Sequence, residues 1–305
     1  MAQLIKLQDY ISRYESDIYH YPAKYIRLKQ EKWKKVKRNW ENGQFDGGSH
    51  PEQSTELPDH KPFNWKQLFS RNKIKEEQWE EPVEEPWIPG DINELKKYFL
   101  DELYPFQLKW ASTTLLEKSF IDPGIENEKY LRMLLQRLPD HYLIMYKPVV
   151  MLKKAAMEAD IIIIGPYHIE LVSCIDVEAD FISPQSQNKW MIEKDGEQRT
   201  IFSPLLSLRR TETFLRSIMQ TYEHPIDFKL TVLAYDLTIS ASKEPYLTSY
   251  IDKHSFESWL AEKRKLGAPL KHGQLALAEN LLKHTRTIAV KRPEWEDDET
   301  AATDE

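Results

Sequence analysis

The stretch MEADIIIIGPYHIELVSCID, residues 157–176, contains the side chains whose types and spacing could support metal chemistry. Asp160 opens a run of four isoleucines, a Gly-Pro turn follows, and a second apolar run contains the chain's single cysteine, Cys174. Two short apolar runs around a turn predict a hairpin of two buried strands. A carboxylate at the mouth of such a hairpin could present a divalent cation to a substrate.

Apolar periodicity predicts the elements that must position Asp160. We expect a helix at 124–138, strands at 141–152, 158–165 and 168–176, a helix at 205–222, a strand at 228–237, an extended piece ending near 251, and helices at 256–265 and 270–286. Residues 189–204 read as a connection made of turn residues. Short connections between the three strands favour an antiparallel meander, and the following helix can cross back to a fourth strand. The predicted fold class is α/β (α+β), with a mixed central sheet flanked by helices.

The segment from 124 to about 286 resembles the nuclease-related domain (NERD), which belongs to the PD-(D/E)XK nuclease fold. GIENEKYLRMLLQRL fits the first helix of that domain, with Glu128 at its acidic position. EADIIIIGPY fits the strand that carries the family aspartate, with Asp160 at that position, and FSPLLSLRRTETFLRSIM fits the later helix. The resemblance implies a restriction-endonuclease-like fold and metal-dependent cleavage of phosphodiesters.

The family's catalytic motif is altered in this chain. Its Ile-Glu-x-Lys sequence falls on 172–175, so Ser173 stands at the expected Glu position and Ile175 at the expected Lys position. The Asn-Pro-x-x-Gln stretch becomes Ser-Pro-Leu-Leu-Ser at 203–207. A single carboxylate with a hydroxyl is a poor Mg²⁺ site, because that cation is usually bound through one or two carboxylates together with substrate phosphate. We therefore predict that Asp160 and Glu128 are remnants of a site that has lost catalysis, with no metal and no cofactor.

Other charged residues could replace the missing ligands. Glu170, Asp176 and Glu178 have the wrong strand parity if Ser173 and Ile175 face the site, because alternate residues of a strand face opposite sides. A register slip or a bulge would be needed to turn them inward. Lys153, Lys154 and Glu212 could reach the site from neighbouring elements, and Mg²⁺ binding is expected only if such relocated ligands exist.

The chain divides into four regions. Residues 1–40 predict two helices, the first with a 3-4 apolar spacing and ended by Pro22, the second basic at 24–38. Residues 41–91 form an irregular acidic and polar linker, 92–290 the nuclease-related domain with a leading helix kinked near Pro105, and 291–305 a disordered acidic tail. The first helix is predicted from the spacing of Leu4, Leu7, Ile11, Tyr14 and Ile18.

The basic stretch 24–38 has three interpretations. It is a solvated helix, a nucleic-acid contact that works by counterion release, or a surface masked by the acidic segment 76–87. Arg209 and Arg210 follow the Ser-Pro dipeptide and could border the degenerate cleft. The candidate nucleic-acid-binding residues are Lys34, Lys35, Lys37, Arg38, Arg209 and Arg210.

Composition limits the possible classes of protein. The 42 basic and 49 acidic residues give a net charge of −7, which excludes a uniformly basic coat for nucleic acid. One cysteine cannot form an internal disulfide, and Cys174 within LVSCID is expected to be a small buried residue. The start lacks the pattern of a signal peptide, and the apolar runs are too short to span a bilayer. We predict a cytoplasmic protein with no membrane contact.

The sequence thus favours a pseudo-nuclease that binds DNA, RNA or a protein of nucleic-acid metabolism, and the resemblance to the nuclease-related domain implies a bacterial origin. One alternative is an active metal-dependent nuclease with relocated ligands. The other is a structural or partner-binding protein with no nucleic-acid role.

Overall fold

A six-stranded mixed sheet forms the centre of the computed structural model, which describes residues 1–45, 87–152, 155–225, 227–241 and 243–292. Its strands, in spatial order, are β1 (Gln3–Leu7), β3 (Leu143–Tyr146), β6 (Ile161–Ile164), β7 (His168–Cys174), β11 (Asp227–Ala234) and β13 (Thr248–Asp252). Strand β6 is antiparallel to both β3 and β7, whereas β11 is parallel to β7 and β13. The predicted meander and the crossover to a parallel fourth strand are therefore confirmed.

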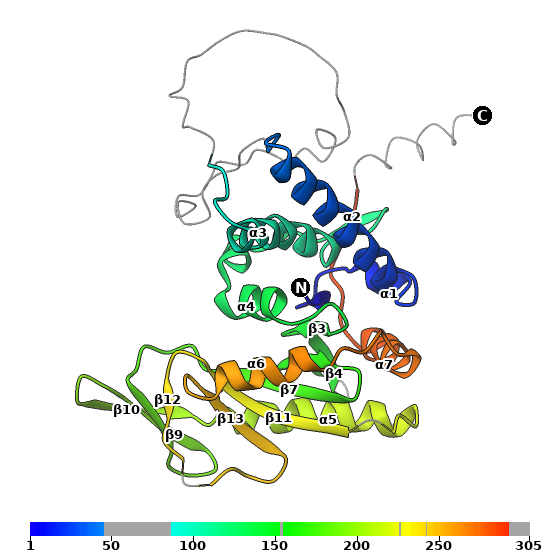
Figure 1. Cartoon of the computed structure of the whole chain (residues 1–305). Helices are drawn as coiled ribbons and strands as arrows, with labels where there is room; N and C mark the ends of the chain where they lie inside the picture. The colour runs from blue at the N-terminus through cyan, green and yellow to red at the C-terminus, as the bar shows by residue number, and fades with distance from the viewer. Residues whose placement is uncertain (46–86, 153–154, 226, 242, 293–305) are drawn as a thin grey trace. The chain divides into compact units, whose positions relative to one another are not determined.

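Helices cover both faces of this sheet (Figure 1). They include α4 (Lys129–Arg137), α5 (Leu205–Thr221), α6 (Phe256–Lys265) and α7 (His272–Lys283). Residues of opposite parity in β7 show the two faces, because Ser173 contacts Ser207 of α5 while Glu170 contacts Lys263 of α6. All four isoleucines of β6 are buried, as a strand covered on both faces requires. The mixed α/β architecture with a helix-flanked sheet is confirmed.

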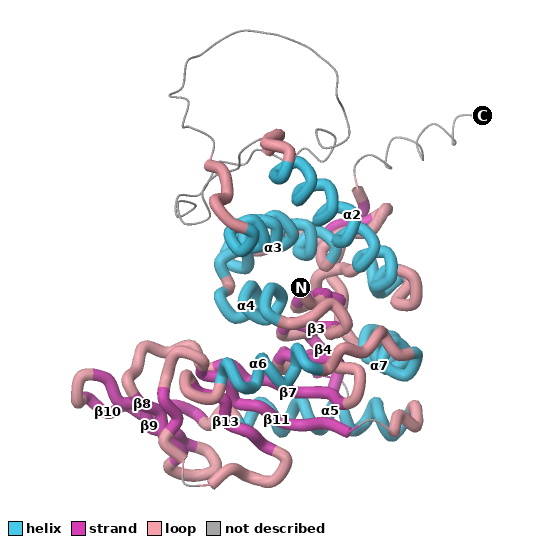
Figure 2. The backbone as a smooth tube through the Cα atoms, in the orientation of Figure 1, coloured by secondary structure: helices cyan, strands magenta, loops and turns pink. Residues whose placement is uncertain are grey.

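A second, four-stranded sheet was not predicted from the sequence (Figure 2). It has the order β10 (Glu197–Phe202), β9 (Lys189–Lys194), β8 (Phe181–Pro184) and β12 (Thr238–Ile239). The prediction of a turn-rich connection at 189–204 is wrong. Asp195 and Gly196, at the tip of the β9–β10 hairpin, both have positive φ, 52° and 81°. An Asp-Gly pair in that conformation is a strong hairpin signal.

The predicted first helix is also wrong. Residues Gln3–Leu7 form strand β1, which pairs in parallel with β3, and only the short α1 (Arg13–Ser16) follows. The strand is buried throughout, including Lys6, whose ammonium lies 2.5 Å from Glu15 and donates to the carbonyl of Tyr10. Pairing along the sheet outweighs the 3-4 spacing, whose apolar residues lie partly in the strand and partly in the turn that follows. Pro22 lies in the first turn of α2 (Tyr21–Glu41), where its missing N–H costs nothing.

Several predicted boundaries also need correction. The strand expected at 141–152 divides into β3 and β4 (Val149–Leu152), because Lys147 takes a positive φ of 44° before Pro148. Strand β4 pairs with an unpredicted β5 (Ala155–Glu158). A 3-10 turn, Pro123–Asn127, precedes α4, so the helix expected at 124–138 begins later. Helix α3 (Ile92–Trp110) contains Pro105 and ends before β2 (Glu117–Lys118), which pairs with β14 (Val290–Lys291) at the start of the predicted tail.

The chain divides into two compact units, residues 1–29 with 103–305 and residues 30–102. Within the second unit, Trp33 packs on Phe99 with ring centres 5.2 Å apart, and the indole N–H of Trp40 donates to the carbonyl of Pro89 at 2.8 Å. Predictions for 46–86, for Lys153 and Lys154, and for 293–305 concern residues outside those that the structure describes. In the described part of the chain, no helix combines the length and apolar character that crossing a bilayer requires.

Candidate nucleic-acid interface beside Asp160

Asp160 lies immediately before β6, and hydroxyl groups of α5 occupy both of its carboxylate oxygens. Ser207 Oγ donates to Oδ1 at 3.0 Å, and Thr211 Oγ1 donates to Oδ2 at 2.9 Å. The backbone N–H of Asp160 in turn donates to Thr211 Oγ1 at 2.9 Å. Residues 207 and 211 are one helical turn apart, so they present their hydroxyls on the same face of α5.

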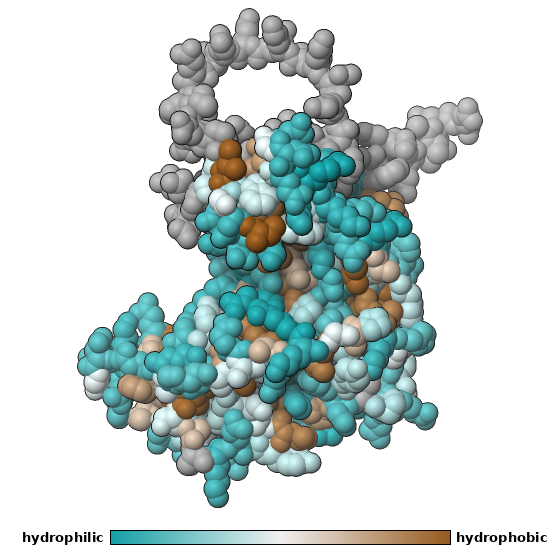
Figure 3. Space-filling model, viewed as in Figure 1, coloured by the Kyte–Doolittle hydropathy of each residue, from teal (hydrophilic) through white to brown (hydrophobic). Residues whose placement is uncertain are grey.

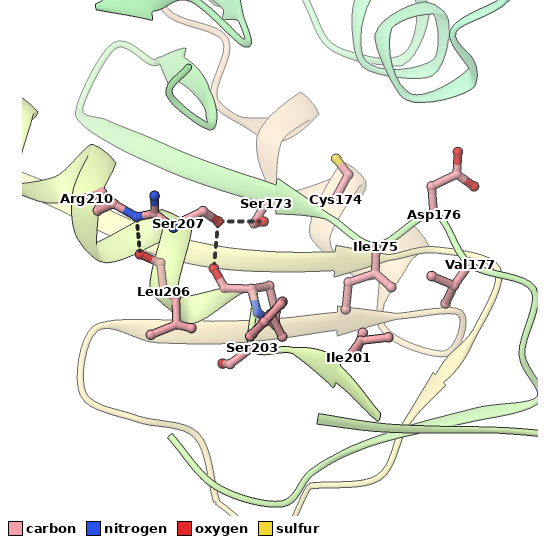
Figure 4. A pocket seen from close by; sticks show the side chains of 12 residues that line it. Ser173, Cys174, Ile175, Asp176, Val177, Ile201, Ser203, Leu206, Ser207 and Arg210 are labelled. Carbon is pink, nitrogen blue, oxygen red and sulfur yellow. Dashed lines mark hydrogen bonds between the residues drawn. The ribbon is translucent and has the colours of Figure 1, made fainter. Parts of the chain in front are cut away.

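Ser173 faces this carboxylate from β7. Its Oγ lies 3.5 Å from Ser207 Oγ. Figure 4 marks this contact by a dashed line. Ile161 pairs with Val172 in the register of β6 and β7, which places Asp160 and Ser173 side by side. The structure thus brings Asp160 and Ser173 together, the two residues that the family resemblance assigned to one site, and the second of these carries a hydroxyl.

Ile175, at the expected lysine position, follows the end of β7. Its N–H donates to the carbonyl of Leu233 at 2.9 Å, and its carbonyl accepts from Tyr130 Oη. The side chain is only 5% exposed and lines the cavity beside Asp160. It supplies an apolar wall where an ammonium would be needed for phosphate chemistry.

Burial dominates the electrostatics of Asp160. Burial raises the pKa of its carboxyl group, and this effect outweighs the opposing hydrogen bonds from Thr211, Ser173 and Ser207 and the charge of Arg210. Among the described residues, hydroxyl groups and not a second carboxylate contact the two oxygens of Asp160, and a single carboxyl is a weak ligand for a hard cation.

Each acidic residue considered as a replacement ligand is engaged elsewhere. Glu170 is 3% exposed and pairs with Lys263. Asp176 contacts Lys129 at 2.5 Å, and Glu178 contacts Lys194 at 2.5 Å. Glu212 pairs with Arg216 at 2.8 Å on the surface of α5. Within the described ranges, no three His, Cys, Asp or Glu side chains come together as a possible metal-binding group.

Glu128 precedes α4 as its N-cap residue, and its side chain makes no capping hydrogen bond. Burial, followed by the neighbouring Glu128 carboxylate, raises the pKa of Tyr146. Burial also raises the pKa of Cys174, with further contributions from Asp160 and Glu128. Cys174 points away from Ser173 in Figure 4, and Glu128 is not among the described residues that line the cavity beside Ser173.

A cavity of about 540 Å³ lies beside Asp160, between the end of β7, the end of β10 and the start of α5. One wall carries polar groups, namely Ser173, Cys174, Asp176, Ser203, Ser207 and Arg210, and the other is apolar. The carboxylate of Asp176 at this edge is paired with Lys129. The apolar wall consists of Ile175, Val177, Ile201, Phe202, Pro204 and Leu206. Phe202 is 84% exposed at this edge, so its ring is available to a ligand. Apolar side chains also reach the surface over the β8–β10 sheet, at the left of Figure 3.

The predicted basic residues have different surroundings. Arg210 lines the cavity, whereas Arg209 is exposed and is not among the described residues that line it. Lys34, Lys35 and Arg38 are on α2, and Lys37 lies 3.5 Å from Glu41. Phe202, Ser207 and Thr211 were not predicted to be parts of the site. The i, i+4 spacing of Ser207 and Thr211 was the available signal for a shared polar face.

Comparisons with known proteins give one partial similarity. The chain is 39% identical over 113 residues to an RNA 2',3'-cyclic phosphodiesterase from Geobacillus stearothermophilus. The match covers 35% of this chain and 36% of that protein, so the similarity spans about a third of the relative's length. No family model matches the chain, and no solved structure matches it.

Proposed function

We propose that this chain is a nuclease-related (NERD-like) protein that has lost metal-dependent cleavage and binds nucleic acid, with RNA as the favoured ligand, in the cytoplasm and without a cofactor. The order α4, β3, β6, β7, α5, β11 supports the resemblance to the PD-(D/E)XK fold. The observation that carries the proposal is that hydroxyl groups satisfy both oxygens of Asp160. Ser173 and Ile175, which line the cavity beside it, stand where the resemblance to the nuclease-related domain would require a second ligand and a lysine.

The cavity supplies groups that suit an unpaired nucleotide. Arg210 offers a guanidinium for a phosphate, the serine hydroxyls offer donors and acceptors, and Phe202 offers an exposed ring for stacking. Stacking on aromatic side chains is tolerant of sequence and suits single strands. The partially similar protein is named for an activity on RNA, which makes RNA the first ligand to test.

Binding can be measured by fluorescence anisotropy with a labelled single-stranded RNA in EDTA at low salt. We expect salt-dependent binding, and we expect Phe202→Ala to weaken it by about 5-fold or more, because removing a base stack costs ~1–3 kcal/mol. Tyr246→Ala is the matched control, since Tyr246 is 90% exposed and is not a described part of the cavity.

Arg210→Gln and Arg209→Gln form a second matched pair. Only Arg210 lines the cavity, so we expect the Arg210 variant alone to weaken binding strongly. Equal losses in the two variants would assign the effect to general charge. No binding at low salt would favour a structural or protein-binding role.

The basic helix is tested separately by reversing the charges of Lys34, Lys35 and Lys37 together. If the helix binds phosphates, the slope of log affinity against log salt falls by about 0.7 for each single-strand phosphate that the variant no longer neutralises. An unchanged slope would identify this part of α2 as a solvated helix.

Catalysis is tested on the same RNA with Mg²⁺ or Mn²⁺, and on an RNA that ends in a 2',3'-cyclic phosphate. Acid–base hydrolysis without a metal uses a positioned acid and base, most often histidine, and the described lining of the cavity contains no histidine. We expect both RNAs to remain intact. Cleavage that disappears in Asp160→Ala would instead establish an active nuclease with relocated ligands.

A further inference from the structure

Three cationic residues from distant parts of the sequence meet at the turn at 112–118. Arg13 lies in α1, Lys109 lies in the last turn of α3, and Arg292 follows β14. The Nε of Arg13 donates to the carbonyl of Thr113 at 3.2 Å, and Thr113 Oγ1 donates to the carbonyl of Lys109 at 2.6 Å. The N–H of Arg292 donates to the carbonyl of Leu116 at 2.8 Å, which fixes that residue at the other side of the same turn.

The three charges act on one another. Burial lowers the pKa of Lys109, and the charges of Arg13 and Arg292 lower it further. Burial also lowers the pKa of Arg13, and Arg292 is the cation that adds to this effect. None of the three residues takes part in an ion pair within the described part of the chain.

The fold offers little compensation for this concentration of positive charge. Lys109 lies at the C-terminal end of α3, where the helix dipole amounts to only about half a negative charge. The guanidinium of Arg13 lies 5.4 Å from the centre of the Trp110 ring, which holds it in place but does not neutralise it. The helix dipole and the indole ring therefore offset only a small part of the charge of the three residues.

Arg292 gives an independent indication of a ligand. Its Nε is buried and has no hydrogen-bond acceptor among the described residues. A buried donor without an acceptor is costly, and buried guanidinium groups normally find a carboxylate or a phosphate. An oxyanion beside Arg292 would satisfy this donor and also offset the repulsion among the three cations.

We propose that Arg13, Lys109 and Arg292 form a binding site for a phosphate group, separate from the cleft at Asp160. The two guanidinium groups supply directed donors, and the ammonium adds a compact charge, a combination suited to a phosphate. Two sources share this chemistry, a free phosphate compound and a lipid headgroup. The second source is included because exposed apolar side chains neighbour Arg292 along β2 and β14, among them Leu116 and Val290.

The test is a titration of the full chain with inorganic phosphate, in which calorimetry measures the binding. The ionic strength is held constant, and chloride is the reference anion. We expect saturable binding that Lys109→Gln weakens by about tenfold, since a hydrogen bond to a charged group contributes ~1.5–3 kcal/mol. Lys109 is exposed, so this variant should fold, and its thermal melt verifies that. Lys253→Gln, an exposed lysine in the turn after β13, is the matched control.

Arg292→Gln provides a second measurement on a different element, and Lys109→Arg should retain binding because the charge and the donors remain. Flotation with vesicles containing phosphatidic acid separates the two sources, because a lipid headgroup site gives retention that Lys109→Gln reduces. The proposal is overturned if phosphate and vesicles both fail to bind. It is also overturned if Lys109→Gln and Lys253→Gln bind phosphate equally well.

Discussion

Replacing Lys263 by methionine should destabilise the protein strongly, because it leaves Glu170 charged and buried. Glu170 is 3% exposed and Lys263 5% exposed. One carboxylate oxygen of Glu170 accepts from Thr231 Oγ1 at 2.6 Å and from Trp259 Nε1 at 2.8 Å, and the other accepts from Lys263. The pair joins β7 to α6, on the face of the sheet that lies opposite Ser173.

The magnitude follows from the burial of the pair. Removing one partner of a buried ion pair costs ~3–5 kcal/mol. In a domain of this size each kcal/mol lowers the melting temperature by about 2–4 °C, so Lys263→Met should melt about 6–20 °C below the wild type at pH 7. Lys265→Met, an exposed lysine at the end of the same helix, should change the melting temperature little.

The pH dependence of the melting temperature gives a second test of the pair. Burial alone would raise the pKa of Glu170, but the Lys263 charge and the hydrogen bonds outweigh burial and lower it. In the wild type this carboxylate therefore stabilises the fold above its unfolded pKa, and that contribution is lost as the pH falls through the folded value. In Lys263→Met the pKa rises instead, so the deficit should shrink as the pH is lowered from 7 to 5.

Thermal unfolding followed by circular dichroism at both pH values measures these effects. The double variant Glu170→Leu/Lys263→Met removes both charges and should recover most of the loss. A single variant that melts with the wild type at pH 7 would refute the structural role of the pair. It would return Glu170 to the set of possible functional carboxylates.

Three further predictions concern the cleft and the sheet beside it. The double variant Ser173→Glu/Ile175→Lys should create a Mn²⁺ site that depends on Asp160, because position 173 faces that carboxylate through Ser207. Calorimetry detects the bound Mn²⁺. A double variant that binds no more Mn²⁺ than the wild type would contradict this geometry. Burial raises the pKa of Asp160, so its ionisation weakens the fold as the pH rises through the folded pKa, and Asp160→Asn should melt at or above the wild-type temperature at pH 7. That difference should vanish below about pH 3.5, where the carboxyl is protonated in both states. Gly165→Ala should lower the free energy of unfolding by ~1–3 kcal/mol, because its Cβ would lie 2.9 Å from the Tyr142 ring; denaturant titration measures it, and an unchanged midpoint would show that the ring can move.

Local patterns in the sequence predicted the sheet that carries the site. The isoleucine run, the Gly-Pro turn and the period of two predicted the β6–β7 pairing and the opposite faces of Ser173 and Glu170. The β9–β10 hairpin was also predictable from Asp195-Gly196 and was overlooked. Strand β1 was not predictable in this way, because its pairing with β3 joins residues about 140 positions apart and overrides a helical spacing.

The polar contacts of the site were harder to predict than its backbone. Nothing in the sequence near Asp160 indicates that Ser207 and Thr211 occupy its carboxylate, because that contact depends on how α5 packs against β6 and β7. The convergence of Arg13, Lys109 and Arg292 depends in the same way on three segments that meet only in the folded chain. Period and turn chemistry describe neighbours along the chain, whereas these clusters arise from tertiary packing.

The central claim is that the described residues give Asp160 no second acidic ligand with which to hold a divalent cation. It is tested most directly by titrating Mn²⁺ into the full chain and counting the bound ions by electron paramagnetic resonance, with Asp160→Ala in parallel. We expect the two proteins to bind Mn²⁺ equally and weakly. A stoichiometric Mn²⁺ site in the wild type that is lost in Asp160→Ala would contradict it.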